Sequence, residues 1–272
     1  MRARHLLLLA APGALVIAFF FLLPLAAVSL DASAGAFARV LRNELFWGGL
    51  RNSLVLAATA STFSLALGFA VALHLSRLSE ALRTALVFFI ALPLTFSGLI
   101  VAYGFILGYG RAGFVTQSLG LLGVDPVAFS ALLYSPVGLA FASSYYLIPR
   151  VVLLLLPVLL NFDRAQLAAA ESLGATRGRA IRDVMLPQIL PTAFTAFCLI
   201  AAVTIGAYGT ALALVGTRVN ILPLQLYSMI SETGSDFPAA AALSLILMAI
   251  CSCVMVLGEL VAARHEGRDA HA

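Results

Sequence analysis

Apolar residues along this chain fall into six long runs, separated by shorter segments that carry most of the charged residues. A helix needs about 20 mainly apolar residues to cross the hydrocarbon core of a bilayer. The pattern therefore predicts an all-α integral membrane protein with a single transmembrane domain over residues 1–272. The six predicted spans cover residues 6–30, 53–75, 85–107, 128–148, 191–214 and 239–262.

The composition agrees with this class. Hydrophobic residues make up 62% of the chain and charged residues only 10%, whereas a soluble domain carries about 25% charged residues. So few charges cannot cover a surface that faces water. The chain has no lysine, and we attribute its net charge of +4 to arginines in cytoplasmic loops rather than to nucleic-acid binding.

The first run follows Arg2 and Arg4, as the apolar core of a signal peptide would. It is longer than the roughly 7–15 apolar residues of a cleavable signal, so we expect a retained first helix. Positively charged loops stay in the cytoplasm, which favours both termini inside. That topology places inside Arg2, Arg4, Arg77, Arg83, Arg150, Arg164, Arg177, Arg179, Arg182, Arg264 and Arg268, and outside Arg39, Arg42, Arg51, Arg111 and Arg218.

Candidate chemistry is sparse in this sequence. Cys198, Cys251 and Cys253 lie in apolar runs without a partner at metal-ligand spacing, so we expect neither a metal site nor a disulfide framework. The sequence has no phosphate-binding glycine loop with a lysine and no arrangement of a nucleophile with a base. We therefore expect no catalytic residue and no cofactor bound by this chain.

Prolines and glycines interrupt several of the apolar runs, which predicts either ordinary helix packing or kinked helices around a pathway. The polar side chains inside these runs would line the pathway or hydrogen-bond a neighbouring helix. Arg150 and Glu259 fall near predicted cytoplasmic ends, and the absence of a titratable group in mid-span weighs against an ion-coupled carrier. The candidate pathway residues are Thr95, Ser97, Thr204 and Tyr208.

The longest predicted cytoplasmic loop, residues 151–190, begins with a helix signal. Asp163 and Gln166 have the spacing of a capping box, in which Gln166 would reach back toward the cap. Alanine-rich helix formers follow, and Gly174 supplies the left-handed conformation that commonly ends a helix. A first short helix with a small-residue face is expected before Gly174.

A second short helix is predicted directly after this turn. Thr176 would cap it, it would run from Arg177 to about Met185, and Pro187 would stop it. The product is a helical hairpin whose alanine face lets another protein approach closely. Its rim would be charged by Arg177, Arg179 and Arg182.

This loop resembles the EAA loop of binding-protein-dependent ABC importer permeases. The family pattern is Glu-Ala-Ala, three residues, Gly, nine residues and Ile-x-Leu-Pro. In this chain the match begins at Ala168, its glycine is Gly174, and its last four residues are Val184 to Pro187. The position between the fourth and fifth spans also agrees. The resemblance assigns ATPase coupling to Ala168, Ala169, Ala170, Glu171, Gly174, Ala175, Arg177, Val184, Leu186 and Pro187.

One position departs from the family pattern. Ala168 stands where the family has its leading glutamate, which removes any ion pair that this glutamate would make. Glu171 lies three residues on, on an adjoining helical face, and is a candidate substitute.

The resemblance implies a set of partners. They are two cytoplasmic ATPase subunits that bind ATP and magnesium, a second permease subunit of different or identical sequence, and an extracytoplasmic solute-binding protein. The implied location is the bacterial inner membrane. A secondary transporter or a membrane scaffold without an ATPase remains the alternative.

The third span and the last outer loop are most similar to permeases of the polyamine, iron(III), thiamine and aminoalkylphosphonate group. That similarity implies a small polar substrate of the polyamine or aminoalkylphosphonate kind. The outer carboxylates Asp31, Glu232 and Asp236 would favour a cation, although loop carboxylates are usually only solvated.

Overall fold

A computed structural model describes residues 11–231 and 236–269, and over these ranges the chain forms helices and no strands. Within these ranges six helical segments are long and apolar enough to cross a membrane, which confirms the predicted fold class. They cover Ala11–Asp31, Glu44–Leu75, Gly98–Gly120, Pro136–Asn161, Arg177–Ile205 and Phe237–Ala263. Residues 6–10 of the first predicted span lie outside the described residues.

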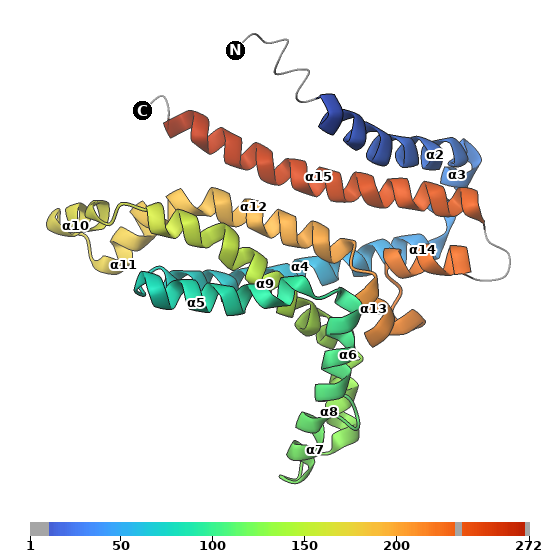
Figure 1. Cartoon of the computed structure of the whole chain (residues 1–272), viewed down its shortest axis with the longest axis horizontal. Coiled ribbons are helices and arrows are strands. Elements are labelled where there is room, and N and C mark those ends of the chain that lie inside the picture. The colour runs from blue at the N-terminus through green and yellow to red at the C-terminus, as the bar shows by residue number, and fades with distance from the viewer. Residues whose placement is uncertain (1–10, 232–235, 270–272) are drawn as a thin grey trace.

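Long helices lie side by side and form the body of the molecule (Figure 1). Its core pairs are α4 with α9 and α12 with α15, and α12 also contacts α4 and α9. The helices of this bundle are α4 (Glu44–Leu75), α9 (Pro136–Asn161), α12 (Leu186–Ile205) and α15 (Phe237–Asp269), with α2 (Leu23–Asp31) against α15 and α5 (Glu80–Ala91) against α9.

Shorter helices lie at the two ends of the bundle and at its side (Figure 1). One end carries α10 (Ala165–Ser172) and α11 (Arg177–Ala180), and the other carries α3 (Ala34–Arg42), α13 (Gly209–Leu214) and α14 (Leu222–Ser231). An arm that projects crosswise consists of α6 (Gly98–Tyr109), α7 (Phe114–Gly120) and α8 (Pro126–Leu133). Single turns complete the chain: η1 (Ala18–Leu22) and η3 (Ile181–Met185) are π-helical, and η2 (Leu92–Thr95) and η4 (Gly216–Arg218) are 3₁₀.

Small residues bring the core helices close together. A Cβ on Gly68 of α4 would lie 2.6 Å from Cγ1 of Val151 in α9, so only glycine fits there. Ser64 of α4 donates a hydrogen bond of 3.1 Å to Ser144 of α9 in the same interface. Membrane helices associate through such close contacts and polar bonds, because lipid removes the hydrophobic drive between them.

The third predicted span is not one helix. α5 ends at Ala91, η2 contains Pro93, and α6 begins only at Gly98, where the chain turns crosswise. Pro93 cannot donate a backbone hydrogen bond, and Phe96 and Ser97 have extended backbone. The Ser97 hydroxyl accepts a bond from the Ile100 N–H and so starts a new helix.

The fourth predicted span is displaced along the chain. α8 ends at Leu133, Ser135 caps α9 by accepting from the Gly138 N–H, and Pro136 takes the first helical position. α9 then continues through Pro149 and Pro157 to Asn161, well beyond residue 148. Arg150 therefore lies in mid-helix, and the prediction that it sits at a cytoplasmic end is wrong.

The fifth predicted span also has other limits. Pro187 does not stop a short helix, because α11, η3 and α12 run on as one helix. The Leu186 N–H bonds back to the Ile181 carbonyl, five residues earlier, so a π turn directly precedes the proline and the helix continues through it. At the far end α12 stops at Ile205 with Gly206 as its cap, and a separate helix, α13, begins at Gly209.

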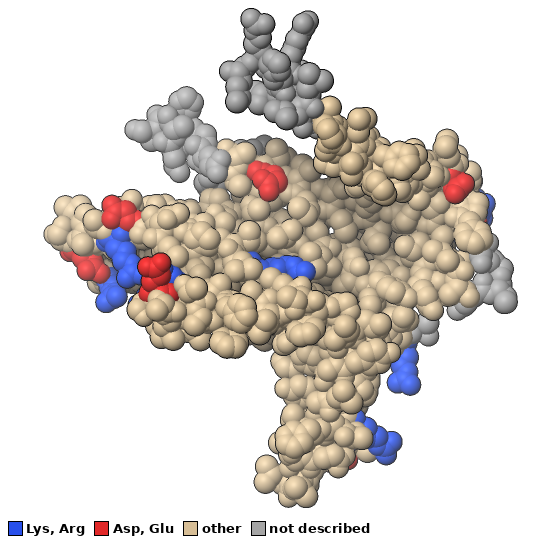
Figure 2. Space-filling view, viewed as in Figure 1, with Lys and Arg blue, Asp and Glu red and all other residues tan. Residues whose placement is uncertain are grey.

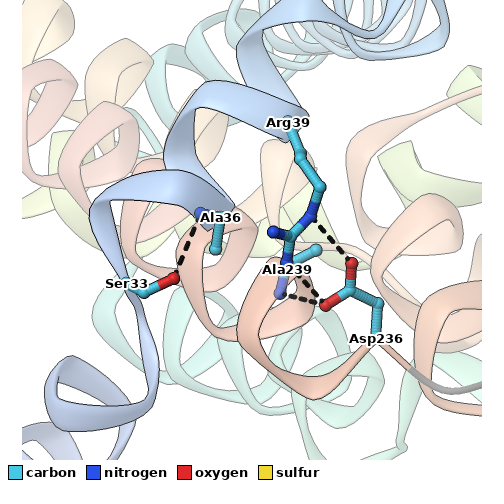
Figure 3. Close-up of polar contacts among 5 residues, drawn as sticks. All are labelled: Ser33, Ala36, Arg39, Asp236 and Ala239. Carbon is cyan, nitrogen blue, oxygen red and sulfur yellow. Dashed lines mark hydrogen bonds and ion pairs between the residues drawn. The ribbon is translucent and has the colours of Figure 1, made fainter.

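An ion pair connects α3 to the beginning of α15 (Figure 3). The Arg39 guanidinium donates to both Asp236 oxygens at 3.2 and 3.0 Å, and Asp236 accepts from the Ala239 N–H at 3.1 Å. The backbone bond first, and then Arg39, lower the pKa of the Asp236 carboxyl below its ordinary value. Asp236 is thus a helix cap rather than a free carboxylate for a cation; Glu232 lies outside the described residues.

We expect Asp236→Asn to lower the thermal unfolding midpoint at neutral pH, because asparagine still caps the helix but loses the charge that faces Arg39. Asp236→Ala should lower it further. A carboxyl whose pKa is lower in the folded chain than in the unfolded chain stabilises the fold at pH values above the unfolded pKa. The difference in unfolding midpoint between wild type and Asp236→Asn should therefore be fully present above about pH 5, and it should shrink as the carboxyl protonates below about pH 4. Unfolding in detergent at pH 7 and pH 3.5 measures this. A difference that is equal at both pH values would contradict the role of the charge.

Candidate functional site

The loop between α9 and α11, residues 162–176, begins with half of the predicted capping box. The Asp163 carboxylate accepts a bond of 2.8 Å from the Ala165 N–H, at the start of α10. The prediction that Gln166 reaches back to the cap is wrong, because its side-chain oxygen accepts a bond of 2.7 Å from Gln188 of α12. This contact ties α10 to the neighbouring helix instead.

Gly174 ends α10 in the left-handed conformation that the sequence predicted, with φ of +89°. The Ala175 N–H bonds to the Ala170 carbonyl at 3.1 Å, and the Gly174 N–H bonds to the Glu171 carbonyl at 3.0 Å. These two bonds form a Schellman motif, which satisfies carbonyls that a helix end otherwise leaves free. The Thr176 hydroxyl then accepts from the Arg179 N–H at 3.4 Å, so the predicted cap of the next helix is confirmed.

The 162–176 loop is held against the bundle by Arg164. Its guanidinium donates a bond of 3.0 Å to the carbonyl of Ser76, the C-cap residue of α4. A free carbonyl at a helix C-terminus is partly negative, so a guanidinium is well suited to it. The loop is therefore fixed to α4 by Arg164 and to α12 by Gln166.

The residues assigned to ATPase coupling lie on and beside this loop. Ala168, Ala169, Glu171, Gly174, Arg177, Leu186 and Pro187 are exposed, and Ala170, Ala175 and Val184 are half-buried. The list from the sequence missed Leu173, whose side chain is 88% exposed at the tip of the turn. A large apolar residue directly before the helix-ending glycine was the signal that pointed to it.

Charged side chains gather at the end of the bundle that carries α10 and α11 (Figure 2). The face between the two ends carries few charges in this view, with one blue patch near its centre and one red patch above it. A belt with few charges between charged ends is what a helix bundle in a bilayer requires.

A second candidate site is a cavity of about 260 Å³ where two helix breaks meet. One wall comes from the break between α5 and α6, another from the break between α12 and α13, and a third from α9. The lining residues are Leu94, Phe96, Gly98, Tyr146, Arg150, Val203, Gly206, Ala207, Tyr208, Gly209 and Thr210.

The two breaks are joined directly. The Thr210 hydroxyl donates a bond of 3.1 Å to the Gly98 carbonyl, and a Cβ on Gly98 would lie 2.5 Å from that hydroxyl. The Tyr208 ring packs on the Tyr227 ring of α14 with centroids 5.3 Å apart. Irregular backbone at membrane depth is tolerated where it is buried in protein or lines a cavity, and both conditions are met here.

The four polar residues proposed for the pathway have different surroundings. Tyr208 lies in the cavity wall. Thr95 and Ser97 are exposed in the break beside it; Thr95 donates to the Leu92 carbonyl at 2.7 Å, and Ser97 caps α6. Thr204 is 3% exposed and donates to the Ile200 carbonyl of its own helix at 2.7 Å.

Arg150 brings a charge into the cavity. Its Nη1 donates a bond of 2.6 Å to the Tyr146 carbonyl, and its guanidinium lies 5.5 Å from the centre of the Tyr146 ring. At 1.5 Å per residue it is about 21 Å from the start of α9 and about 17 Å from its end. Among the described residues it forms no ion pair with a carboxylate. A charge at this depth is rare and usually functional.

A larger cavity of about 530 Å³ lies between the N-terminal halves of α4 and α9. Its walls are mostly apolar, with Asn52 and Thr59 as their polar side chains. It holds no charged residue and is separate from both helix breaks.

Comparison with known proteins gives consistent matches over most of the chain. The family model described as "Binding-protein-dependent transport system inner membrane component" matches residues 63–266. The putative 2-aminoethylphosphonate transport system permease protein PhnU of Salmonella choleraesuis (strain SC-B67) is 32% identical over 265 residues, which cover 92% of this chain and 90% of that protein. The spermidine/putrescine transport system permease protein PotB of Salmonella typhimurium (strain SL1344) is 25% identical, over 81% of this chain and 76% of that protein.

A solved structure supports the same architecture. It is the crystal structure of a bacterial alginate ABC transporter in complex with an alginate pentasaccharide-bound periplasmic protein. One of its chains matches with a TM-score of 0.78 at 18% sequence identity, over 97% of this chain and 95% of that chain. At this identity the likeness concerns the fold.

Gly174→Ala should destabilise the 162–176 loop by about 1 kcal/mol, because a Cβ is strained at positive φ although it meets no atom within 4 Å. Gly178→Ala is the matched control, since Gly178 lies in α11 with equally open space and no left-handed φ. Hydrogen exchange of the amides of residues 168–175 should become roughly fivefold faster in Gly174→Ala. It should not accelerate in Gly178→Ala; equal acceleration in both variants would contradict the glycine cap.

Proposed function

The chain belongs to the family of binding-protein-dependent transport system inner membrane components and is a permease of the ABC importer type, and we propose that its 162–176 loop couples ATP hydrolysis in a partner to solute passage through the cavity at the helix breaks. It is a multi-pass inner membrane protein. The observation that carries the coupling proposal is the Gly174 turn, which presents α10 and Leu173 to a partner in one fixed conformation.

The partner at this loop would be a cytoplasmic ATPase. The loop offers an alanine face, an exposed Leu173 and the nearby arginine Arg177, which together fit a cleft with an apolar floor and an acidic rim. ATP and magnesium would bind in two such subunits, because this chain has no phosphate-binding loop. Ala168 presents no charge toward the partner, and exposed Glu171 is the carboxylate nearest to it in α10.

The complete importer would contain a second permease and an extracytoplasmic solute-binding protein. The family name refers to a binding protein, and the related alginate transporter was crystallised with its periplasmic protein. A substrate released from the binding protein would enter near α13 and α14 and reach the cavity at the two breaks. The second permease would supply the remaining wall of the pathway, and the whole of residues 1–272 would form one transmembrane domain.

The substrate we propose is a small polar solute of the aminoalkylphosphonate or polyamine kind. The names of PhnU and PotB support these two classes. The cavity of about 260 Å³ is also smaller than the roughly 300–1,000 Å³ of sites for drug-sized ligands.

We expect both chain termini and the 162–176 loop to be cytoplasmic, because arginines concentrate in the segments assigned to that side. The end of α15 lies at the same end of the bundle as α10, which agrees with this topology (Figure 1). Single cysteines placed at Leu173 and Leu122, in a chain whose native cysteines are replaced, would be labelled in intact spheroplasts. Only the cysteine at Leu122, which is 81% exposed between α7 and α8 of the arm, should react with a membrane-impermeant reagent; labelling of the cysteine at Leu173 from outside would contradict the topology.

Gly174→Leu should insert and fold normally yet lose coupled transport, because the strained turn moves Leu173 away from its docking position. The loop contributes little to packing between spans, so the bundle should be retained. ATP-driven uptake in proteoliposomes and co-purification of the ATPase measure the effect, with Gly178→Leu as a control in the same loop region and Ala168→Glu expected to be tolerated. Wild-type uptake by Gly174→Leu would contradict the coupling role.

A further inference from the structure

Arg150 is the one charged residue among the side chains that line the cavity at the helix breaks, within the described part of the chain. The lining contains no aspartate or glutamate, and the backbone bond to Tyr146 occupies a single guanidinium donor. A guanidinium has five N–H donors in a planar fork, so the remaining donors are available to a ligand. Arg150 is half-buried, and withdrawing a guanidinium partly from water without an acidic partner is unfavourable unless something compensates the charge.

The surroundings of Arg150 favour negative charge from a second direction. The cavity wall includes Gly98, the first residue of the twelve-residue helix α6, whose N-terminus carries the positive end of the helix dipole. Gly98 and Gly209 let the two breaks pack closely beside the cavity, since a Cβ would lie 2.5 Å from the Thr210 hydroxyl at Gly98 and 3.3 Å from the Leu99 nitrogen at Gly209. Arg150 and the start of α6 thus raise the electrostatic potential of the same space.

We propose that Arg150 binds the oxyanion group of the transported solute and sets the importer's preference for a compact oxyanion, such as a phosphonate, over a polyamine. The fork geometry of guanidinium matches the oxygens of phosphonate or sulfate, whereas a polycation is repelled by the same charge. This deepens the proposed function, on which it rests, by choosing between the two substrate classes. Two matches are consistent with this choice. One is the permease named for 2-aminoethylphosphonate, and the other is a permease named for sulfate, which is 28% identical over 86% of this chain.

Arg150 differs in its surroundings from three other arginines of this chain. Arg39 is already paired with Asp236 and Arg182 with Asp183, both at the surface. Arg164 serves to hold the 162–176 loop against α4. Arg150 alone of these four lies in a cavity bounded by helix breaks.

The test uses the complete importer in proteoliposomes, with three solutes in parallel: 2-aminoethylphosphonate, sulfate and spermidine. Each solute is supplied with a binding protein that recognises it, or at high concentration where none does. Wild-type complex should take up one of the two oxyanions in an ATP-dependent manner, and the solute that is taken up identifies which. Arg150→Gln should reduce that uptake by about ten- to a hundredfold, as expected for a lost charge-assisted hydrogen bond.

Two further variants separate charge from structure. Arg150→Lys should retain more uptake than Arg150→Gln, because it keeps the charge without the fork. Arg111→Gln, which removes an exposed arginine between α6 and α7 in the arm, should leave uptake unchanged. In all variants the ATPase should co-purify and hydrolyse ATP as in wild type, since Arg150 is remote from the 162–176 loop.

A second measurement leaves Arg150 in place. Ala207→Cys, in the cavity wall and with Cys198, Cys251 and Cys253 replaced by serine, should react faster with an anionic thiosulfonate reagent than with a cationic one of similar size. Arg150→Gln should reverse or remove that preference.

Unchanged oxyanion uptake by Arg150→Gln, or ATP-dependent uptake of spermidine alone, would overturn the proposal while the importer assignment stands. A cationic preference at Ala207→Cys in the presence of Arg150 would also overturn it. Failure of the ATPase to associate with this permease at all is a different result, because it would contradict the proposed function itself.

Discussion

Hydrogen bonding of the backbone in a medium without water is the constraint on which this structure depends. Within lipid each N–H and C=O must find a partner in the protein, so a span is normally an unbroken helix. Here two spans are interrupted, at residues 92–97 and 206–208, and the interruptions face each other. The Ser97 cap provides a partner for an N–H left free at the start of α6, and the Thr210 bond to the Gly98 carbonyl joins the two breaks. The cavity is thus a consequence of where the helices stop, and the pathway that we propose passes through it.

The sequence predicted the class, the number of spans and the Gly174 turn, because each depends on local properties: apolar length, a left-handed glycine and a threonine cap. It did not predict where spans break, since proline gives no unique signal. Pro149 and Pro157 lie within α9, whereas Pro93 accompanies a break. Pro187 is a further case, since a π turn directly precedes it within a helix that continues. Misplacing the end of the fourth span in turn concealed Arg150, although the sequence shows that arginine plainly.

The two candidate sites are connected by the same helices. α12 runs from the residues next to the 162–176 loop to the break at Gly206, a length of about 30 Å at 1.5 Å per residue. α9 connects the other end of the loop to Arg150. A displacement of the loop by a partner would therefore move both cavity walls as rigid elements. Gly68 against Val151 keeps α4 close to α9, so these helices would move together.

The central claim is that the state of the ATPase at the 162–176 loop controls which side of the membrane reaches the cavity. Accessibility of a cysteine at Ala207, measured in the assembled importer with membrane-impermeant reagents, tests it most directly. The account predicts reaction from the cytoplasmic side without nucleotide and from the outer side when a non-hydrolysable ATP analogue is bound. It also predicts that Gly174→Leu abolishes this exchange. The account would be contradicted if the cysteine reacted from the same side with and without nucleotide, or if the reactive side still changed with nucleotide in Gly174→Leu.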